Sequence, residues 1–140
     1  MQKIVIKPTE AELDILQILW RFGPQTVKQV NEILNKKKET GYTTTLKFMQ
    51  IMTEKDLCTR EAEGKLHIYK ANIKENQVKR SAVTAIIDKV FEGSAMELVI
   101  QTLGNYKATD KELSELKSLI KSMEEESKNQ KEIKRFKSKF

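Results

Sequence analysis

The chain has 140 residues, of which 39% are hydrophobic and 33% charged, enough for one ordinary domain or two small ones. Its net charge of +6 and pI of about 9.3 favour a polyanionic partner, such as nucleic acid or an anionic membrane surface. The single cysteine, Cys58, excludes an internal disulfide, and with no signal-peptide pattern and no membrane-spanning apolar run we expect a cytoplasmic protein without membrane insertion.

The N-terminal residues predict a short extended segment followed by a helix. Residues 2–7 alternate polar and apolar side chains, which fits a strand or an extended arm. Thr9 and Glu12 form a capping box, in which each side chain satisfies a free backbone N–H at a helix start. Apolar side chains follow at helical spacing until Gly23-Pro24, which ends the helix because proline cannot continue it.

A second helix starts at another capping box, Thr26 with Gln29, and ends near residues 36–38, which are three lysines. A third helix is predicted over residues 42–55. Its inward face is expected to consist of Thr45, Met49 and Met52. Leu57–Ala62 and Leu66–Lys70 then predict two strands around a glycine-containing hairpin loop.

This order of arm, three helices and hairpin, with short connections, is that of a winged helix-turn-helix domain. The predicted fold class is therefore mainly α with a small β-hairpin. We expect a winged-helix domain over residues 1–75, a helical dimerisation domain over 76–126, and a basic flexible tail over 127–140.

The C-terminal half predicts three amphipathic helices, the last starting at a third capping box, Thr109 with Glu112. Helices this short cannot bury much apolar surface among themselves, so we expect them to pair with a second copy of the chain. The residues expected in that interface are Val99, Leu103, Leu113, Leu116 and Ile120. The tail is expected to add nonspecific, salt-sensitive affinity for nucleic acid.

Sequence-specific DNA binding requires an element that fits the major groove and carries side chains able to reach base edges. The third helix offers five candidates: Thr43, Thr44, Leu46, Lys47 and Gln50. Gln50 could pair with adenine, Lys47 could reach guanine or a phosphate, and Leu46 could touch a thymine methyl group. Alternatively, Leu46 packs against a neighbouring element.

Arg60 and Lys65 on the hairpin are candidates for contacts with phosphates or the minor groove, although basic residues in a hairpin are often only solvated. With one histidine, His67, and one cysteine, a metal site of the usual ligand count could form only from carboxylates. No catalytic set of Ser, His and Asp and no phosphate-binding glycine loop stands out. We therefore predict no enzymatic activity, no metal and no cofactor.

Four stretches of the chain resemble the BlaI/MecI/CopY family of penicillinase repressors. They are residues 8–20, 41–45, 50–57 and 64–69, within a resemblance that covers about residues 5–123. The resemblance implies a dimeric winged-helix repressor that holds a palindromic operator in double-stranded DNA. The positions that match the family's base-reading residues are Thr43, Thr44, Leu46 and Lys47.

Two branches of that family imply different inducers. In the penicillinase branch a membrane sensor-protease triggers cleavage of the repressor. The matching region here is about residues 91–96, with Gly93, Ser94 and Ala95 as the candidate cleavage residues. The Asn-Phe bond expected of that branch is absent, so either this chain is not induced by proteolysis or the bond cut is a different one. The copper-responsive branch carries a C-terminal cysteine pair, which this chain lacks.

Three other functions stay open on the residues alone. A winged-helix module that binds protein would tolerate substitution at Thr43, Thr44 and Lys47. A ligand-sensing regulator of the MarR type would need an apolar pocket between the domains. A nonspecific architectural DNA-binding protein would show no sequence preference.

Overall fold

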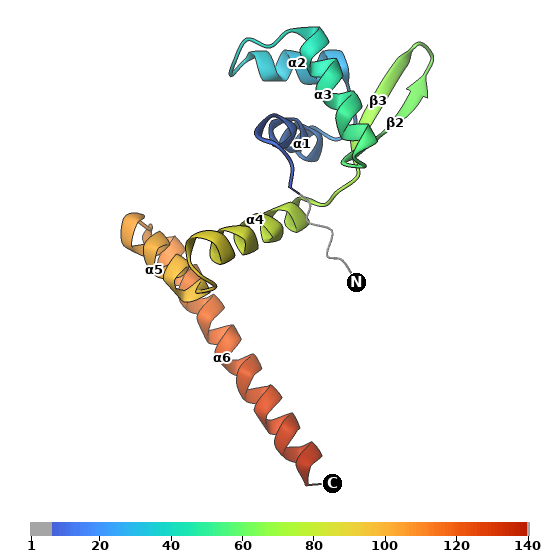
Figure 1. The fold of residues 1–140 in the computed structure, drawn as a ribbon. Helices are drawn as coiled ribbons and strands as arrows, with labels where there is room; N and C mark the ends of the chain where they lie inside the picture. The colour runs from blue at the N-terminus through green and yellow to red at the C-terminus, as the bar shows by residue number, and fades with distance from the viewer. Residues whose placement is uncertain (1–6, 140) are drawn as a thin grey trace. The chain divides into compact units, whose positions relative to one another are not determined.

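The structure is a computed structural model that describes residues 7–139, so the predicted arm lies almost entirely outside the described residues. The fold is mainly α with a small antiparallel sheet, as predicted (Figure 1). The elements are α1 (Glu10–Phe22), β1 (Gln25–Thr26), α2 (Val27–Asn35), α3 (Tyr42–Glu54), β2 (Cys58–Glu63), β3 (Leu66–Ala71), α4 (Glu75–Val90), α5 (Ala95–Asn105) and α6 (Asp110–Ser138).

All three predicted capping boxes form. At the start of α1 the Glu12 backbone N–H donates to Thr9 Oγ1 (3.2 Å) and the Thr9 N–H donates to Glu12 Oε1 (2.9 Å). The same reciprocal pairs start α2, at Thr26 and Gln29, and α6, at Thr109 and Glu112. These short-range signals fix where three of the helices begin.

The sheet has three antiparallel strands in the order β1-β3-β2. Strands β2 and β3 are the predicted hairpin, and Gly64 in its turn adopts a φ of 62°, a left-handed conformation that favours glycine. Strand β1 was not predicted, because two residues are too few to show a period. It pairs with β3 so that Gln25 lies opposite Tyr69.

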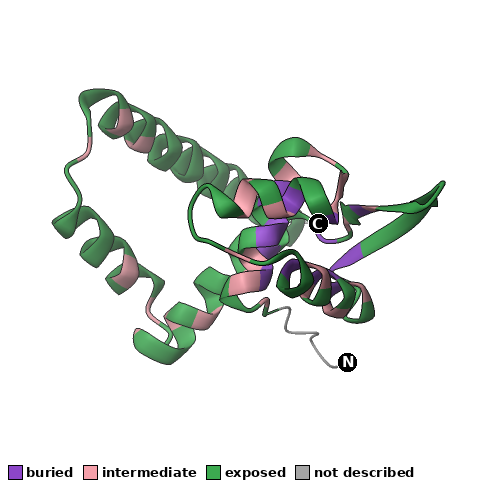
Figure 2. Cartoon of the chain, turned by 90° about the horizontal axis from the view of Figure 1, so that it is seen from above, coloured by how far each residue is buried: buried purple, intermediate pink, exposed green. Residues whose placement is uncertain are grey.

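The hydrophobic core lies among α1, α2, α3 and the sheet. Figure 2 shows the buried residues concentrated there. Thr45, Met49 and Met52 are each 0% exposed, which confirms the predicted inward face of α3. Trp20 on α1 closes one side of the core, since its indole N–H donates to the backbone oxygen of Ile73 at 2.8 Å.

A buried ion pair joins the start of α1 to the end of α3. Glu12 is only 2% exposed, and its Oε2 lies 3.0 Å from the Nζ of Lys55, the residue that caps α3. Burial by itself raises the pKa of the Glu12 carboxyl, but the Thr9 N–H and the Lys55 ammonium hold that pKa below its ordinary value. The carboxylate is therefore charged in the folded chain at neutral pH.

The chain divides into two compact units, Met1–Glu92 and Gly93–Phe140. The division falls after α4, whereas we expected a domain boundary after residue 75. The difference arises because α4 begins against the first unit: Ile73 and Val78 are buried in its core. Among the described helices, none is long and apolar enough to cross a membrane.

The predicted flexible tail is helical in the structure. Residues 127–138 continue α6 without a break, whereas the sequence predicted that the helical domain ends at residue 126. The segment after Gly104 contains no glycine or proline and is rich in Lys, Glu, Gln and Arg, which are strong helix formers. Arg135 and Lys137 in the last turn also stabilise the negative end of the helix dipole.

We predict that Glu12→Gln lowers the free energy of unfolding by about 1–2 kcal/mol at neutral pH, a modest value because Lys55 is half exposed. Because the pKa of Glu12 is lower in the folded than in the unfolded chain, its stabilising effect is present above about pH 4.3 and is lost as the pH falls below that value. Urea unfolding at a series of pH values measures both effects.

Glu10→Gln is the matched control, since Glu10 lies in the same helical turn but is exposed. It should leave the stability close to that of the natural chain. Equal acid sensitivity of the Glu12→Gln variant and the natural chain would contradict the role assigned to the ion pair.

Candidate nucleic-acid interface

The outer surface of α3 carries a stripe of exposed polar side chains. Thr43, Lys47, Gln50 and Glu54 are all exposed and recur at spacings of four, three and four residues. At 3.6 residues per turn this spacing keeps them on one face, opposite the buried Met52 side. The structure thus brings three of the five predicted helix residues together on the most accessible line of the helix.

A hydrogen-bond network holds the start of α3 against α2. The side-chain amide of Asn31 donates to the backbone oxygen of Thr40 and to Thr45 Oγ1, both at 2.8 Å. Asn35 joins the network: it donates to Asn31 Oδ1 and accepts from the Thr40 N–H at 2.7 Å. The turn between the two helices is thereby fixed, and with it the direction in which the outer stripe faces.

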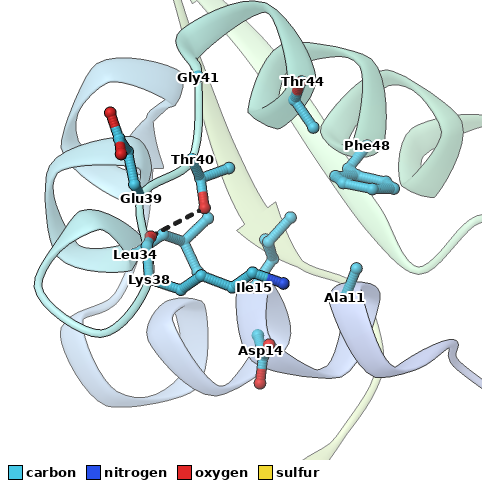
Figure 3. A pocket seen from close by; sticks show the side chains of 10 residues that line it. All are labelled: Ala11, Asp14, Ile15, Leu34, Lys38, Glu39, Thr40, Gly41, Thr44 and Phe48. Atoms are coloured by element: carbon cyan, nitrogen blue, oxygen red, sulfur yellow. Dashed lines mark hydrogen bonds between the residues drawn. The ribbon is translucent and has the colours of Figure 1, made fainter.

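Thr44 lies on a flank of α3 instead of the central stripe. It is exposed, and it lines a pocket of about 380 Å³ between α1, the α2–α3 turn and α3. Figure 3 shows Thr44 and Phe48 facing Ala11 and Ile15 of α1 across this pocket. Asp14, Lys38 and Glu39 are charged lining residues, so the pocket is not the wholly apolar one that a ligand-sensing regulator would need.

Leu46 lies on the opposite flank of α3, and its surroundings differ from those of the stripe. It is partly buried and packs against the hydrophobic core, which is the alternative contact that we considered for it. Its position follows from helical geometry, because residues 46 and 53 both turn toward the sheet and away from the line through Thr43 and Lys47. Leu46 therefore offers less surface for a thymine contact than a fully outward residue would.

The hairpin brings a cation beside the stripe. Arg60 and three residues from the C-terminal half of α3, Gln50, Thr53 and Glu54, line one shared hollow. Side chains alternate along a strand, so Arg60 shares the face of Cys58, which is buried toward α3. Glu61 and Glu63 lie on the other face of β2, where their charges are directed away from this hollow.

Lys65 is exposed in the turn between β2 and β3, at the far end of the hairpin from Cys58. The structure does not place it beside Arg60. These two predicted cations therefore belong to separate parts of the wing, one against α3 and one at the tip.

Two features of this surface were not in the predicted site. Glu54 was not among the predicted DNA-binding residues, although a carboxylate can accept a hydrogen bond from the amino group of cytosine. The exposed lysines 36–38, at the end of α2, add positive charge near the start of α3. Three consecutive lysines in the sequence indicate contacts with phosphates as well as a favourable interaction with the helix dipole.

Cys58 is a buried residue of the core, whereas His67 lies on the surface. Cys58 is 1% exposed and donates a hydrogen bond to the backbone oxygen of Met49 (3.7 Å). Burial raises the pKa of its thiol, which disfavours the reactive thiolate. His67 is exposed on β3. Within residues 7–139 no group of His, Cys, Asp and Glu is placed to hold a metal ion.

The residues predicted to pair with a second copy are largely exposed. Val99 and Leu103 on α5 and Leu113 and Ile120 on α6 are between 44% and 54% exposed, and Leu116 is partly buried. No residue between 95 and 138 in these two helices is fully buried. This unit of the chain therefore carries apolar surface that it does not cover by itself.

The predicted cleavage region consists of the end of the turn between α4 and α5 and the first residue of α5, Ala95. Gly93 is exposed with a φ of 87°, and Ser94 caps α5 by accepting the N–H of Glu97 at 3.1 Å. Gly93, Ser94 and Ala95 thus begin the second compact unit.

Comparison with known proteins gives consistent matches. A model of the penicillinase repressor family matches residues 8–122. A penicillinase repressor of Staphylococcus aureus is 24% identical over 110 residues, which cover 79% of this chain and 87% of that protein. A penicillinase repressor of Bacillus licheniformis is 22% identical over 123 residues, covering 88% and 93%.

One similar solved structure is that of the monomeric form of Bacillus licheniformis BlaI in complex with the blaP half-operator. It aligns with a TM-score of 0.46 and 22% sequence identity, and the alignment covers 54% of this chain and 92% of that chain. The family match extends over most of the sequence and includes all the stretches on which the resemblance was based. The chain therefore belongs to the penicillinase repressor family.

Proposed function

We propose that this chain is a DNA-binding transcriptional repressor that acts as a homodimer on a palindromic operator. The observation that carries the proposal is the exposed polar stripe of α3. Its orientation is fixed by the buried opposite face of the same helix and by the hydrogen bond from the Asn31 amide to Thr45. Membership of the penicillinase repressor family supports repression as the outcome of binding. A regulator of this kind works in the cytoplasm and performs no catalysis.

The stripe supplies the side-chain chemistry that base recognition requires. Gln50 can pair bidentately with adenine, Lys47 can donate to guanine, and Thr43 can donate or accept. Thr44 and Leu46, on the flanks, reach the edges of the same groove. Arg60 beside α3 and Lys65 at the hairpin tip contact phosphates or the minor groove, which positions the helix.

Pairing of two copies through α5 and α6 gives the second half of the proposal. The exposed apolar surface of these helices is expected to be covered by the same surface of a partner related by a two-fold axis. Two α3 helices would then lie about one DNA turn apart, or a multiple of it, which requires a palindromic site.

Derepression follows from cleavage in the α4–α5 turn at Gly93, Ser94 or Ala95, triggered by a membrane sensor-protease. The accessible turn supports this site, because proteases act on exposed segments between packed elements. Cleavage would separate the DNA-binding unit from the helices that pair.

The function is tested by selecting bound sequences from random duplex DNA at about physiological salt, where nonspecific binding is weak. We expect a palindromic consensus with two half-sites. Bound DNA without a consensus would instead support an architectural role. No binding at all would support a winged-helix module that recognises protein.

Replacing Lys47 with Ala should weaken binding to the selected operator by roughly 1–3 kcal/mol, because a base contact is lost. Fluorescence anisotropy with operator and scrambled duplexes measures the loss on each. Lys89→Ala, a change of the same kind at an exposed position of α4, is the control and should bind as the natural chain does. An equal loss on both duplexes would make Lys47 a phosphate contact.

Replacing Leu116 with Asp should convert the dimer to a monomer, because a carboxylate would be placed in the apolar seam. Sedimentation velocity measures the oligomeric state. Ser118→Asp introduces the same charge on the exposed opposite side of α6 and should leave the dimer intact. A dimer that survives the Leu116 change would show that the interface lies elsewhere.

A further inference from the structure

The last four turns of α6 lie beyond the part of the chain that matches the family. The match ends at residue 122, whereas α6 continues to Ser138. The end of this part, residues 128–138, is called the extension here and contains five Lys or Arg residues and one acidic residue, Glu132. It follows three consecutive glutamates at 124–126, so the surface of the extension has a different chemistry from the segment that precedes it.

The apolar seam of α6 stops before the extension. Leu116, Ile120 and Met123 recur at spacings of four and three residues, the spacing of a helix-pairing seam. The next positions in that series are polar: Ser127, Gln130, Lys134 and Lys137. A second copy continuing the same seam would bring lysines together, so pairing does not explain the extension.

A separate apolar face appears on the extension instead. Ile133 is 54% exposed and Phe136 is 65% exposed, and their spacing of three residues places them on one side of the helix. At 100° per residue this side lies about 130° around the helix from the Leu116 seam. Lys128, Lys131 and Arg135 lie on roughly the opposite side of the helix.

We propose that residues 128–138 of α6 bind the surface of an anionic phospholipid membrane. The helix lies along the surface with Ile133 and Phe136 seated among the acyl chains near the headgroups. Lys137 flanks the apolar face, and its long side chain reaches the lipid phosphates. The helix does not span the bilayer, in keeping with its charge.

Charge complementarity selects this partner, and the apolar pair distinguishes it from DNA. Each basic residue close to an anionic lipid surface strengthens binding by roughly fivefold. Phosphates of DNA would attract the same cations, but contacts with phosphates leave exposed Ile133 and Phe136 without a function. Only a surface that is both anionic and apolar just beneath its phosphates attracts the net positive charge of this segment and also takes up its apolar pair.

The test is sedimentation of the full chain with vesicles, in the absence of DNA and at about 0.1 M salt. With equal parts of phosphatidylglycerol and phosphatidylcholine we expect most of the protein in the pellet, and with phosphatidylcholine alone we expect it in the supernatant. Failure to bind the anionic vesicles would overturn the proposal, whether or not the chain binds an operator.

The double change Ile133→Ser with Phe136→Ser removes the apolar face and keeps every charge. We expect the vesicle partition coefficient to fall by about tenfold or more. The matched control is Phe22→Ser with Leu66→Ser, two apolar residues of the first unit with exposures of 52% and 61%, and it should bind as the natural chain does. Circular dichroism of each variant verifies that the helices are retained.

Two results would overturn the seating of the helix. Undiminished vesicle binding by the Ile133→Ser, Phe136→Ser variant would reduce the interaction to charge alone. Absence of vesicle binding, combined with a flatter salt dependence of DNA binding after deletion of residues 128–140, would assign the extension to DNA.

Discussion

The direction in which the polar stripe faces depends on how firmly α3 is packed, because a helix can present a fixed outer surface only if it cannot rotate about its axis. Three independent contacts prevent rotation. Thr45 at its start accepts the Asn31 amide, Met49 and Met52 fill the core from its middle, and Lys55 at its end pairs with the buried Glu12 of α1. These contacts come from both neighbouring helices, so the stripe is oriented by the whole first unit.

Features set by nearby residues were predictable, and features set by distant ones were not. The capping boxes involve residues three apart, and all three formed as predicted. The ion pair between Glu12 and Lys55 joins residues 43 apart and had no signal in the sequence. The same distinction explains Leu46: the helical period puts it on the flank of α3, but only the packing of the first unit decides that this flank is half-buried.

In the C-terminal half, charge and helix propensity gave opposite expectations. The basic run beyond residue 127 suggested a flexible tail, yet its Lys, Glu, Gln and Arg residues favour helix and no glycine or proline interrupts them. Propensity dominates here because α6 is already nucleated at the Thr109 capping box, and adding residues to an existing helix avoids the cost of a new nucleus.

The two units differ in where their apolar surface is covered, and this difference links pairing to DNA binding. The first unit buries a core of its own, whereas α5 and α6 leave their apolar side chains exposed, and in the proposed dimer a partner covers them. In the dimer that we propose, pairing would double the number of α3 helices that engage one operator, so the affinity would depend on protein concentration. A cut in the α4–α5 turn would leave the first unit folded and able to touch DNA, but it would remove the connection that makes two weak contacts act as one.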